Sequence, residues 1–120
     1  MKNYIHVIED NEDIRYIVEY FLLDHDYEVE VSASVKEFTA HVEGPLPDLF
    51  LVDVMLPDGN GLEICRHLKN EKRTQHIPVI IMSAHSNEYE VRKESDANDF
   101  ISKPFDLKEL VKRIETLLQK

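Results

Sequence analysis

The chain has 120 residues, of which 42% are hydrophobic and 32% charged, and its net charge at pH 7 is −10. A chain of this length and apolar content folds as an ordinary globular domain rather than as a disordered segment, so we expect residues 1–120 to form one domain. The excess of acidic residues repels phosphate backbones, which argues against direct binding to nucleic acid. The apolar runs are too short for a membrane span, the first residues lack the pattern of a secretion signal, and the single Cys65 suits a reducing compartment. These features predict a cytoplasmic protein.

Short apolar runs alternate with helical periodicity along the whole sequence. In chain order, the runs predict strands over 4–8, 27–31, 49–52, 79–82 and 100–101. Three of them are apolar at nearly every position, which is typical of strands covered on both faces, whereas 27–31 alternates as an edge strand does. The intervening periodicity predicts helices over 14–22, from Ser34 onward, and over 61–70, 87–94 and 107–118.

Three of these helices have recognisable starts. Ser34 and Asp106 are each followed three residues later by a glutamate, which predicts a helix start with reciprocal side-chain caps. Asn60, with Glu63, predicts a similar start for the helix over 61–70.

Five strand–helix pairs in alternation predict an α/β fold, in which one doubly wound parallel sheet carries helices on both faces. In an open parallel sheet, the loops that follow the carboxyl ends of the strands form the ligand crevice. The residues at these positions are Glu9 and Asp10, Asp53, Ser83 and Ala84, and Lys103 and Pro104. We therefore expect acids, a hydroxyl and a lysine to share one edge of the sheet.

This set suits phosphoryl chemistry. An uncompensated carboxylate beside a dry core is costly, and a group of them needs a cation; hard oxygen ligands of this kind suit Mg²⁺. With Mg²⁺ held by Glu9, Asp10 and Asp53, the Asp53 carboxylate would stay ionised and could accept a phosphoryl group, as aspartate does in other proteins. Lys103 and Ser83 could then contact the phosphoryl oxygens.

Each of these residues also has a simpler explanation when taken alone. A strand-end aspartate is commonly a helix cap or a solvated loop residue, and acids at a helix start are favoured by its dipole. Four separate strand ends would have to imitate one site by chance, which favours the functional explanation. The histidines show no metal-ligand spacing, so His6 is interpreted as a satisfied core imidazole, and Cys65 as a small core residue.

In this order and spacing, the motifs resemble the receiver domain of two-component response regulators, the chemotaxis-regulator-like family, over the whole chain. The motifs are Glu9-Asp10, Asp53-Val54-Met55-Leu56-Pro57 with Gly61, Ser83-Ala84, and Lys103-Pro104-Phe105. The resemblance implies a flavodoxin-like (βα)5 fold with strand order 2-1-3-4-5. It also implies that Asp53 accepts a phosphoryl group from a sensor histidine kinase or a histidine phosphotransfer protein. The Mg²⁺ ligands would be Glu9, Asp10, Asp53 and the backbone carbonyl of Met55.

The same resemblance implies a switch. Lys103 would contact the phosphoryl group beside Ser83 and Ala84, and the Lys103–Pro104 peptide would be cis. Ser83 would be drawn toward the phosphoryl group, Phe100 would turn inward, and the face formed by the fourth helix, fifth strand and fifth helix would change. The chain would be a monomer or a phosphorylation-dependent dimer.

The sequence departs from the family pattern at four places. Phe100 lacks the hydroxyl of the commoner tyrosine, and Asp96 stands where the family often has glycine, which implies a left-handed backbone there. The segment from Ser83 to Lys103 is slightly short, so helix four is expected to be abbreviated or displaced. Met55 and His85 occupy positions that tune dephosphorylation in the family.

Three hypotheses remain open from the sequence. The first is a signalling receiver that catalyses its own phosphorylation and is not a turnover enzyme. The second is a Mg²⁺-dependent phosphatase with an aspartate nucleophile; such enzymes usually carry a second acid two residues further on, where this chain has Met55. The third is a phosphorylation-independent interaction module, which would be favoured if an acid or Lys103 were missing.

Overall fold

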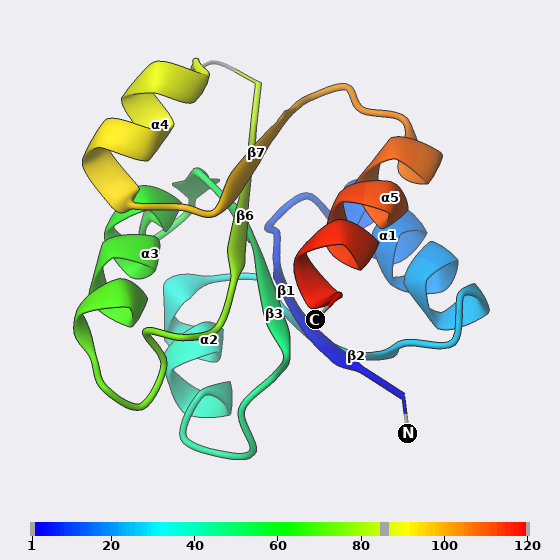
Figure 1. Cartoon of the computed structure of the whole chain (residues 1–120), viewed down its shortest axis with the longest axis horizontal. Helices are drawn as coiled ribbons and strands as arrows, with labels where there is room; N and C mark the ends of the chain where they lie inside the picture. The colour runs from blue at the N-terminus through cyan, green and yellow to red at the C-terminus, as the bar shows by residue number, and fades with distance from the viewer. Residues whose placement is uncertain (1, 85–86, 120) are drawn as a thin grey trace.

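Five parallel strands form the central sheet of the chain. The structure is a computed structural model, and it describes residues 2–84 and 87–119. The strands are β1 (Tyr4–Ile8), β2 (Glu28–Ser32), β3 (Leu49–Asp53), β6 (Val79–Ser83) and β7 (Asp99–Ser102), in the spatial order β2-β1-β3-β6-β7 (Figure 1). Counting only the strands of this sheet, that order is 2-1-3-4-5, so the predicted doubly wound flavodoxin-like fold is confirmed.

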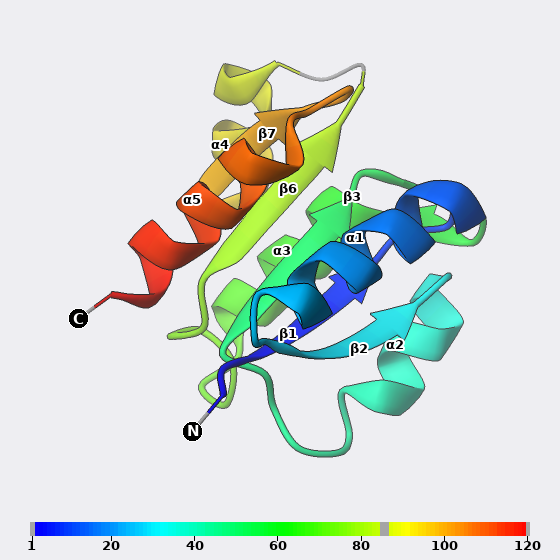
Figure 2. The same ribbon diagram turned by 90° about the vertical axis from the view of Figure 1, so that its right-hand side faces the viewer.

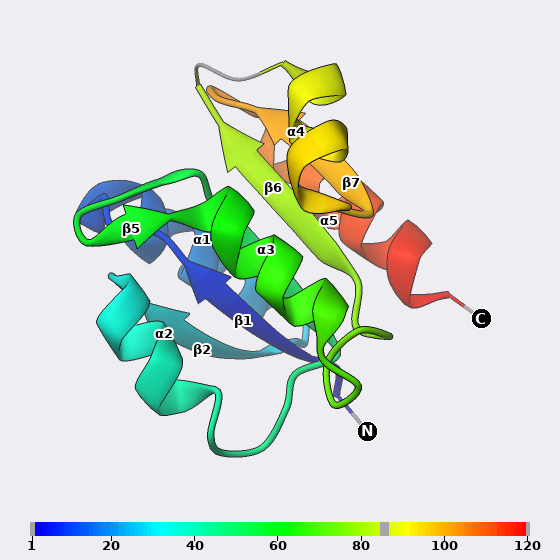
Figure 3. The same ribbon diagram turned by 90° about the vertical axis from the view of Figure 1, so that its left-hand side faces the viewer.

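Helices cover both faces of the sheet. Helices α1 (Glu12–Asp24) and α5 (Leu107–Leu118) lie on one face (Figure 2). Helices α2 (Val35–His41), α3 (Gly61–Asn70) and α4 (Glu88–Ser95) lie on the other (Figure 3). Each face buries its own apolar cluster, one around Phe50 and Ile81 and the other around Leu51 and Ile80. None of the described helices is long and apolar enough to cross a membrane.

The strand burial follows the sequence pattern. Every residue of β3 and β6 is buried, whereas β2 at the sheet edge is mostly half-buried. Strand β2 begins one residue later than predicted, because the N–H of Tyr27 donates a hydrogen bond to the carbonyl of Leu22 near the end of α1. The preceding Asp26 makes that turn with a φ of 66°.

The predicted helix starts are confirmed, but the reciprocal caps are wrong. The side chains of Ser34, Asn60 and Asp106 each accept a hydrogen bond from a backbone N–H in the first turn of their helices. The return contacts of a capping box are not made. Glu37 accepts from the N–H of Ala33, 2.8 Å away, rather than from that of Ser34. Glu109 pairs with Arg113.

Helix α4 is short, as the sequence predicts, with eight residues. Its C-cap is Asp96, whose φ of 59° and ψ of 28° place it in the left-handed region. The predicted left-handed backbone at this position is therefore confirmed. His85, to which the resemblance gives a tuning role, lies outside the described residues.

A small hairpin follows β3 and was not predicted. Strands β4 (Met55–Leu56) and β5 (Gly59–Asn60) pair in antiparallel fashion between β3 and α3. Two-residue strands are too short to show the alternation by which a strand is recognised in a sequence.

Candidate functional site

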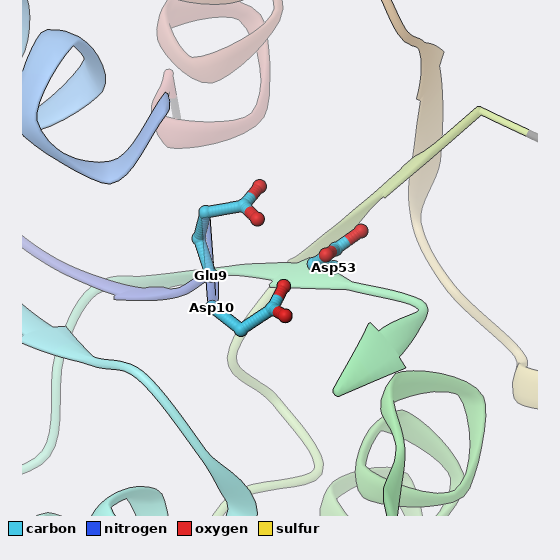
Figure 4. A group of neighbouring side chains, drawn as sticks. All are labelled: Glu9, Asp10 and Asp53. Atoms are coloured by element: carbon cyan, nitrogen blue, oxygen red, sulfur yellow. The ribbon is translucent and has the colours of Figure 1, made fainter. Parts of the chain in front are cut away.

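Three carboxylates meet at the carboxyl edge of the sheet. Glu9 and Asp10 directly follow β1, and Asp53 is the last residue of the neighbouring strand β3. One ligand atom from each lies within 4.8 Å of those from the other two, and the side chains project into the same space (Figure 4). They border a cavity of about 270 Å³, whose lining comprises Glu9, Asp10, Asn11, Ile14, Asp53, Val54, Met55, Ser83, Ala84 and Lys103. The structure thus brings together the residues that the sequence assigns to the strand ends.

Lys103 is the cation of this site. Its Nζ lies 2.7 Å from Oε1 of Glu9 and 3.1 Å from Oδ1 of Asp53, so one ammonium joins residues from three strand ends. Three carboxylates against one ammonium leave a formal charge of about −2 when all are ionised. The donors are all carboxylate oxygens, and the net charge of the site with Lys103 is about −2 when all are ionised, which fits a divalent cation such as Mg²⁺.

The electrostatics of Asp53 reflect this crowding. Burial, followed by the nearby negative charge of Glu9, raises the pKa of Asp53 from 3.8 to about 7, although Lys103 acts in the opposite direction. Burial lowers the pKa of Lys103, but its hydrogen bonds and charge interactions with Glu9 and Asp53 outweigh this, and its pKa is raised. A further cation beside Asp53 would therefore lower this pKa and favour the ionised carboxylate at neutral pH.

Glu9 is the most constrained of the three acids. It is fully buried, and its second oxygen, Oε2, accepts a hydrogen bond from the N–H of Asn11. Arg15 in α1 adds a contact that the sequence reasoning missed: its Nη1 donates to the carbonyl oxygens of Glu9, at 3.0 Å, and of Asp10, at 3.3 Å. An arginine one turn into a helix has no sequence signal for such a contact, because only the fold brings it back over the preceding loop.

The remaining predicted residues also border the site. Ser83 is the buried last residue of β6, and its carbonyl accepts the N–H of Lys103 at 2.9 Å, which ties the two strand ends together. Ala84 is exposed at the cavity rim. The Lys103–Pro104 peptide is cis, as predicted.

Two residues with predicted roles lie in contrasting environments. Met55 lines the cavity, yet the residue is 65% exposed at the start of the hairpin. Phe100 is 6% exposed and packs in the core cluster that includes Val91 and Ala97. The aromatic ring therefore already has the inward position that the resemblance associates with the switch.

The chain also matches known proteins. Residues 5–115 match the family described as the response regulator receiver domain. The chain belongs to this family of signalling receivers, whose members are phosphorylated on an aspartate by histidine kinases.

Individual relatives agree with this assignment. The chain is 37% identical over 122 residues to the phosphate regulon transcriptional regulatory protein PhoB of Escherichia coli, covering 100% of this chain and 53% of PhoB. It is 36% identical over 116 residues to the response regulator ArlR of Staphylococcus saprophyticus, covering 95% of this chain and 51% of ArlR. The chain thus spans about half the length of the curated relatives it matches.

A solved structure is similar over nearly the same length. The signal receiver domain of a signal transduction histidine kinase from Syntrophus aciditrophicus superimposes with a TM-score of 0.89 at 28% sequence identity. The match covers 97% of this chain and 89% of that one.

Proposed function

We propose that Asp53 is the phosphoacceptor of this receiver, and that a sensor histidine kinase or a histidine phosphotransfer protein is its donor. The observation that carries the proposal is the position of the Lys103 ammonium, in contact with both Glu9 and Asp53. A carboxylate held beside a lysine, on the wall of a cavity and at the end of a buried strand, could attack a phosphorus atom bound in that cavity.

The transfer is a simple displacement. A carboxylate oxygen of Asp53 attacks the phosphorus of a phosphohistidine and forms the P–O bond of an acyl phosphate. The P–N bond breaks, and its electron pair leaves with the imidazole nitrogen, which becomes the free histidine of the donor. Lys103 and the hydroxyl of Ser83 would bind oxygens of the transferred group, since charge neutralisation and positioning dominate such reactions.

Mg²⁺ is the proposed cofactor. Glu9, Asp10, Asp53 and the backbone carbonyl of Met55 would hold it, since all of these donors are oxygen atoms and the site carries a net negative charge. Bound Mg²⁺ supplies charge neutralisation at the phosphoryl oxygens. Ala84 would border the phosphoryl group from the strand β6 side of the cavity.

Phosphorylation would then change the face formed by α4, β7 and α5. Ser83 provides the starting point, because it borders the cavity and its carbonyl is bonded to the N–H of Lys103, one residue after β7. Phe100 in β7 provides the response, since its ring packs against the α4 side of the core. Because the ring already lies inward, phosphorylation would raise the population of this inward rotamer and so carry the state of Asp53 to this face.

A turnover phosphatase is less well supported. The second acid that such an enzyme uses would stand two residues beyond Asp53, where Met55 lies. An interaction module that works without phosphorylation is also disfavoured, because all three acids and Lys103 are present and adjacent. We infer that the chain modifies itself and is not an enzyme acting on other substrates.

We infer that residues 1–120 form one cytoplasmic receiver domain, a monomer or a phosphorylation-dependent dimer. The net charge of −10 disfavours contact of this domain with nucleic acid. PhoB is named as a transcriptional regulatory protein, and this chain matches 53% of it.

Intact mass spectrometry after incubation with Mg²⁺ and acetyl phosphate tests the proposal. We expect one phosphoryl group on the wild-type chain and none on Asp53→Asn. Asp24→Asn, a matched change at the exposed last residue of α1, should be phosphorylated like the wild type. A wild-type chain that gains no phosphoryl group would contradict the proposal.

A further inference from the structure

The hairpin that carries Met55 is attached at its tip to helix α2. In strands β4 and β5, Met55 pairs with Asn60 and Leu56 pairs with Gly59, which leaves Pro57 and Asp58 at the turn. The structure assigns Asp58 a positioning role: it anchors this hairpin to α2 and so holds Met55 at the cation-binding cavity. This inference rests on the proposed function, because it concerns the Mg²⁺ requirement of phosphorylation at Asp53.

The first support is a pair of hydrogen bonds from the start of α2. Oδ1 of Asp58 accepts the N–H of Val35 at 2.8 Å, and Oδ2 accepts the N–H of Lys36 at 3.0 Å. Backbone N–H groups in the first turn of a helix have no partner within the helix, so both are available to an acceptor from elsewhere in the chain. These bonds also lower the pKa of the Asp58 carboxyl, which is therefore ionised at neutral pH.

The second support is the close packing next to Asp58. A Cβ placed on Gly59 would stand 2.7 Å from Cγ2 of Val35, so the backbone of β5 lies directly against the first residue of α2. The hairpin and the helix thus meet where the Gly59 backbone lies against the Val35 side chain, as well as through the carboxylate.

The third support is the exposure of the hairpin tip. Leu56 is buried, but Pro57, Asp58, Gly59 and Asn60 are exposed. Apolar burial therefore fixes one side of the hairpin, and the contacts with α2 fix the tip. At the opposite end, Met55 borders the cavity together with Glu9, Asp10 and Asp53.

Loss of the Asp58 anchor should affect the binding of Mg²⁺ but not the contacts of Lys103. Loss of the Asp58 contacts would loosen the hairpin and raise the entropic cost of holding the Met55 carbonyl on a cation. The contacts of Lys103 with Glu9 and Asp53 lie outside the hairpin and would stay in place. We therefore expect a weaker affinity for Mg²⁺ with an unchanged maximal rate of phosphorylation.

The test is the rate of phosphorylation by acetyl phosphate as a function of Mg²⁺ concentration, measured by intact mass for the wild type, Asp58→Ala and Asp58→Asn. For Asp58→Ala, we expect the half-saturating Mg²⁺ concentration to rise about three- to tenfold, below the range typical of residues that contact a metal ligand directly. The maximal rate at saturating Mg²⁺ should equal that of the wild type. Asp58→Asn keeps one acceptor oxygen and should give an intermediate shift.

Ser34→Ala is the matched control. It removes a cap from the same helix start, where the Ser34 hydroxyl accepts the N–H of Glu37, but it leaves the hairpin contacts in place. Ser34→Ala should lower the melting temperature about as much as Asp58→Ala without changing the half-saturating Mg²⁺ concentration.

The outcomes separate this inference from the function on which it rests. Equal Mg²⁺ requirements for Asp58→Ala, Ser34→Ala and the wild type, with normal phosphorylation of all three, would overturn the inference alone. A lower maximal rate of Asp58→Ala at saturating Mg²⁺ would also overturn it. A wild-type chain that takes up no phosphoryl group at any Mg²⁺ concentration would overturn both.

Discussion

Gly61 lies against the backbone of Asp53: a Cβ on Gly61 would stand 2.0 Å from the carbonyl oxygen of Asp53. The N–H of Gly61 is also bonded to the carbonyl of Val54 at 2.7 Å. The first turn of α3 therefore packs directly on the strand end that carries the proposed phosphoacceptor, and only a residue without a side chain fits there.

Substitution of Gly61 by alanine should therefore disturb Asp53. The obstructing atoms are backbone atoms, which cannot rotate away, so we expect a loss of about 1–3 kcal/mol in the free energy of unfolding. Urea denaturation measures this loss, and phosphorylation by acetyl phosphate should slow at the same time. Gly44→Ala is the control, because its Cβ would make only an ordinary 3.5 Å contact with the His41 carbonyl. Equal stability of the two variants would contradict the packing argument.

Removal of the Asp53 charge should stabilise the metal-free protein at high pH. The pKa of Asp53 is raised from 3.8 to about 7, so the folded state binds this proton more tightly than the unfolded state does. Stability contributed by the protonated form is present below about pH 4 and is lost as the pH rises toward 7. At pH 8 in EDTA, Asp53→Asn should melt about 4 °C higher than the wild type, which corresponds to about 1 kcal/mol.

Differential scanning calorimetry of the same variants measures this difference. Asp24→Asn should melt with the wild type, because Asp24 is exposed on α1. If Asp53→Asn melts no higher than Asp24→Asn, the ionised Asp53 carboxylate does not destabilise the metal-free folded state.

The family resemblance and the chemistry of the site were predictable from the sequence, whereas several supporting contacts were not. Glu9, Asp53 and Lys103 were predicted to converge because each follows an apolar run, and parallel strands end at one edge. The left-handed Asp96 was predicted from the glycine usual at that position. The convergence of the strand ends and the left-handed backbone at Asp96 both follow from short sequence patterns, which can be recognised in one sequence.

One contact that was not predicted joins residues far apart in the chain. The bonds from Asp58 to the start of α2 cross 22 or 23 residues, and the capping signal at Ser34 does not indicate that Asp58 is a further acceptor there. The reciprocal caps were wrong for a related reason: Arg113 lies one turn beyond Glu109, and its charge competes with the backbone for that side chain. Which partner such a side chain takes depends on the folded structure and cannot be predicted from short-range sequence patterns.

Acidification should destabilise the protein through His6. This imidazole is buried beside Phe38 and Phe50, with Nε2 2.8 Å from the Ser32 hydroxyl, and burial lowers its pKa from 6.5 to about 4, with a smaller contribution from His41. The unfolded chain takes up this proton first, so stability is full above pH 6.5 and declines as the pH falls toward 4.

The comparison of the wild type with His6→Gln isolates this contribution. Between pH 7 and pH 4, the free energy of unfolding of the wild type should fall by about 2–3 kcal/mol more than that of the variant. His76→Gln, a change at an exposed histidine, should behave as the wild type does. Parallel pH profiles for the wild type and His6→Gln would exclude His6 as the cause.

Mg²⁺ should raise the melting temperature of the wild type. A ligand that binds only the folded state stabilises it by RT ln(1 + [Mg²⁺]/Kd), or about 1.4 kcal/mol at ten times Kd. Asp10→Asn removes an exposed member of the acid cluster and should abolish most of the rise, whereas Asp13→Asn, in the first turn of α1, should preserve it. A wild-type melting temperature that does not respond to Mg²⁺ at matched ionic strength would argue against a metal site.

The most direct test of the central claim is to locate the phosphoryl group itself. Borohydride reduces an aspartyl phosphate to homoserine, so peptide mass spectrometry of the phosphorylated and reduced chain identifies the acceptor. We predict homoserine at position 53 and at no other aspartate. Homoserine at position 10, or an unmodified Asp53 in a chain that carries a phosphoryl group, would contradict the assignment of Asp53 as the phosphoacceptor.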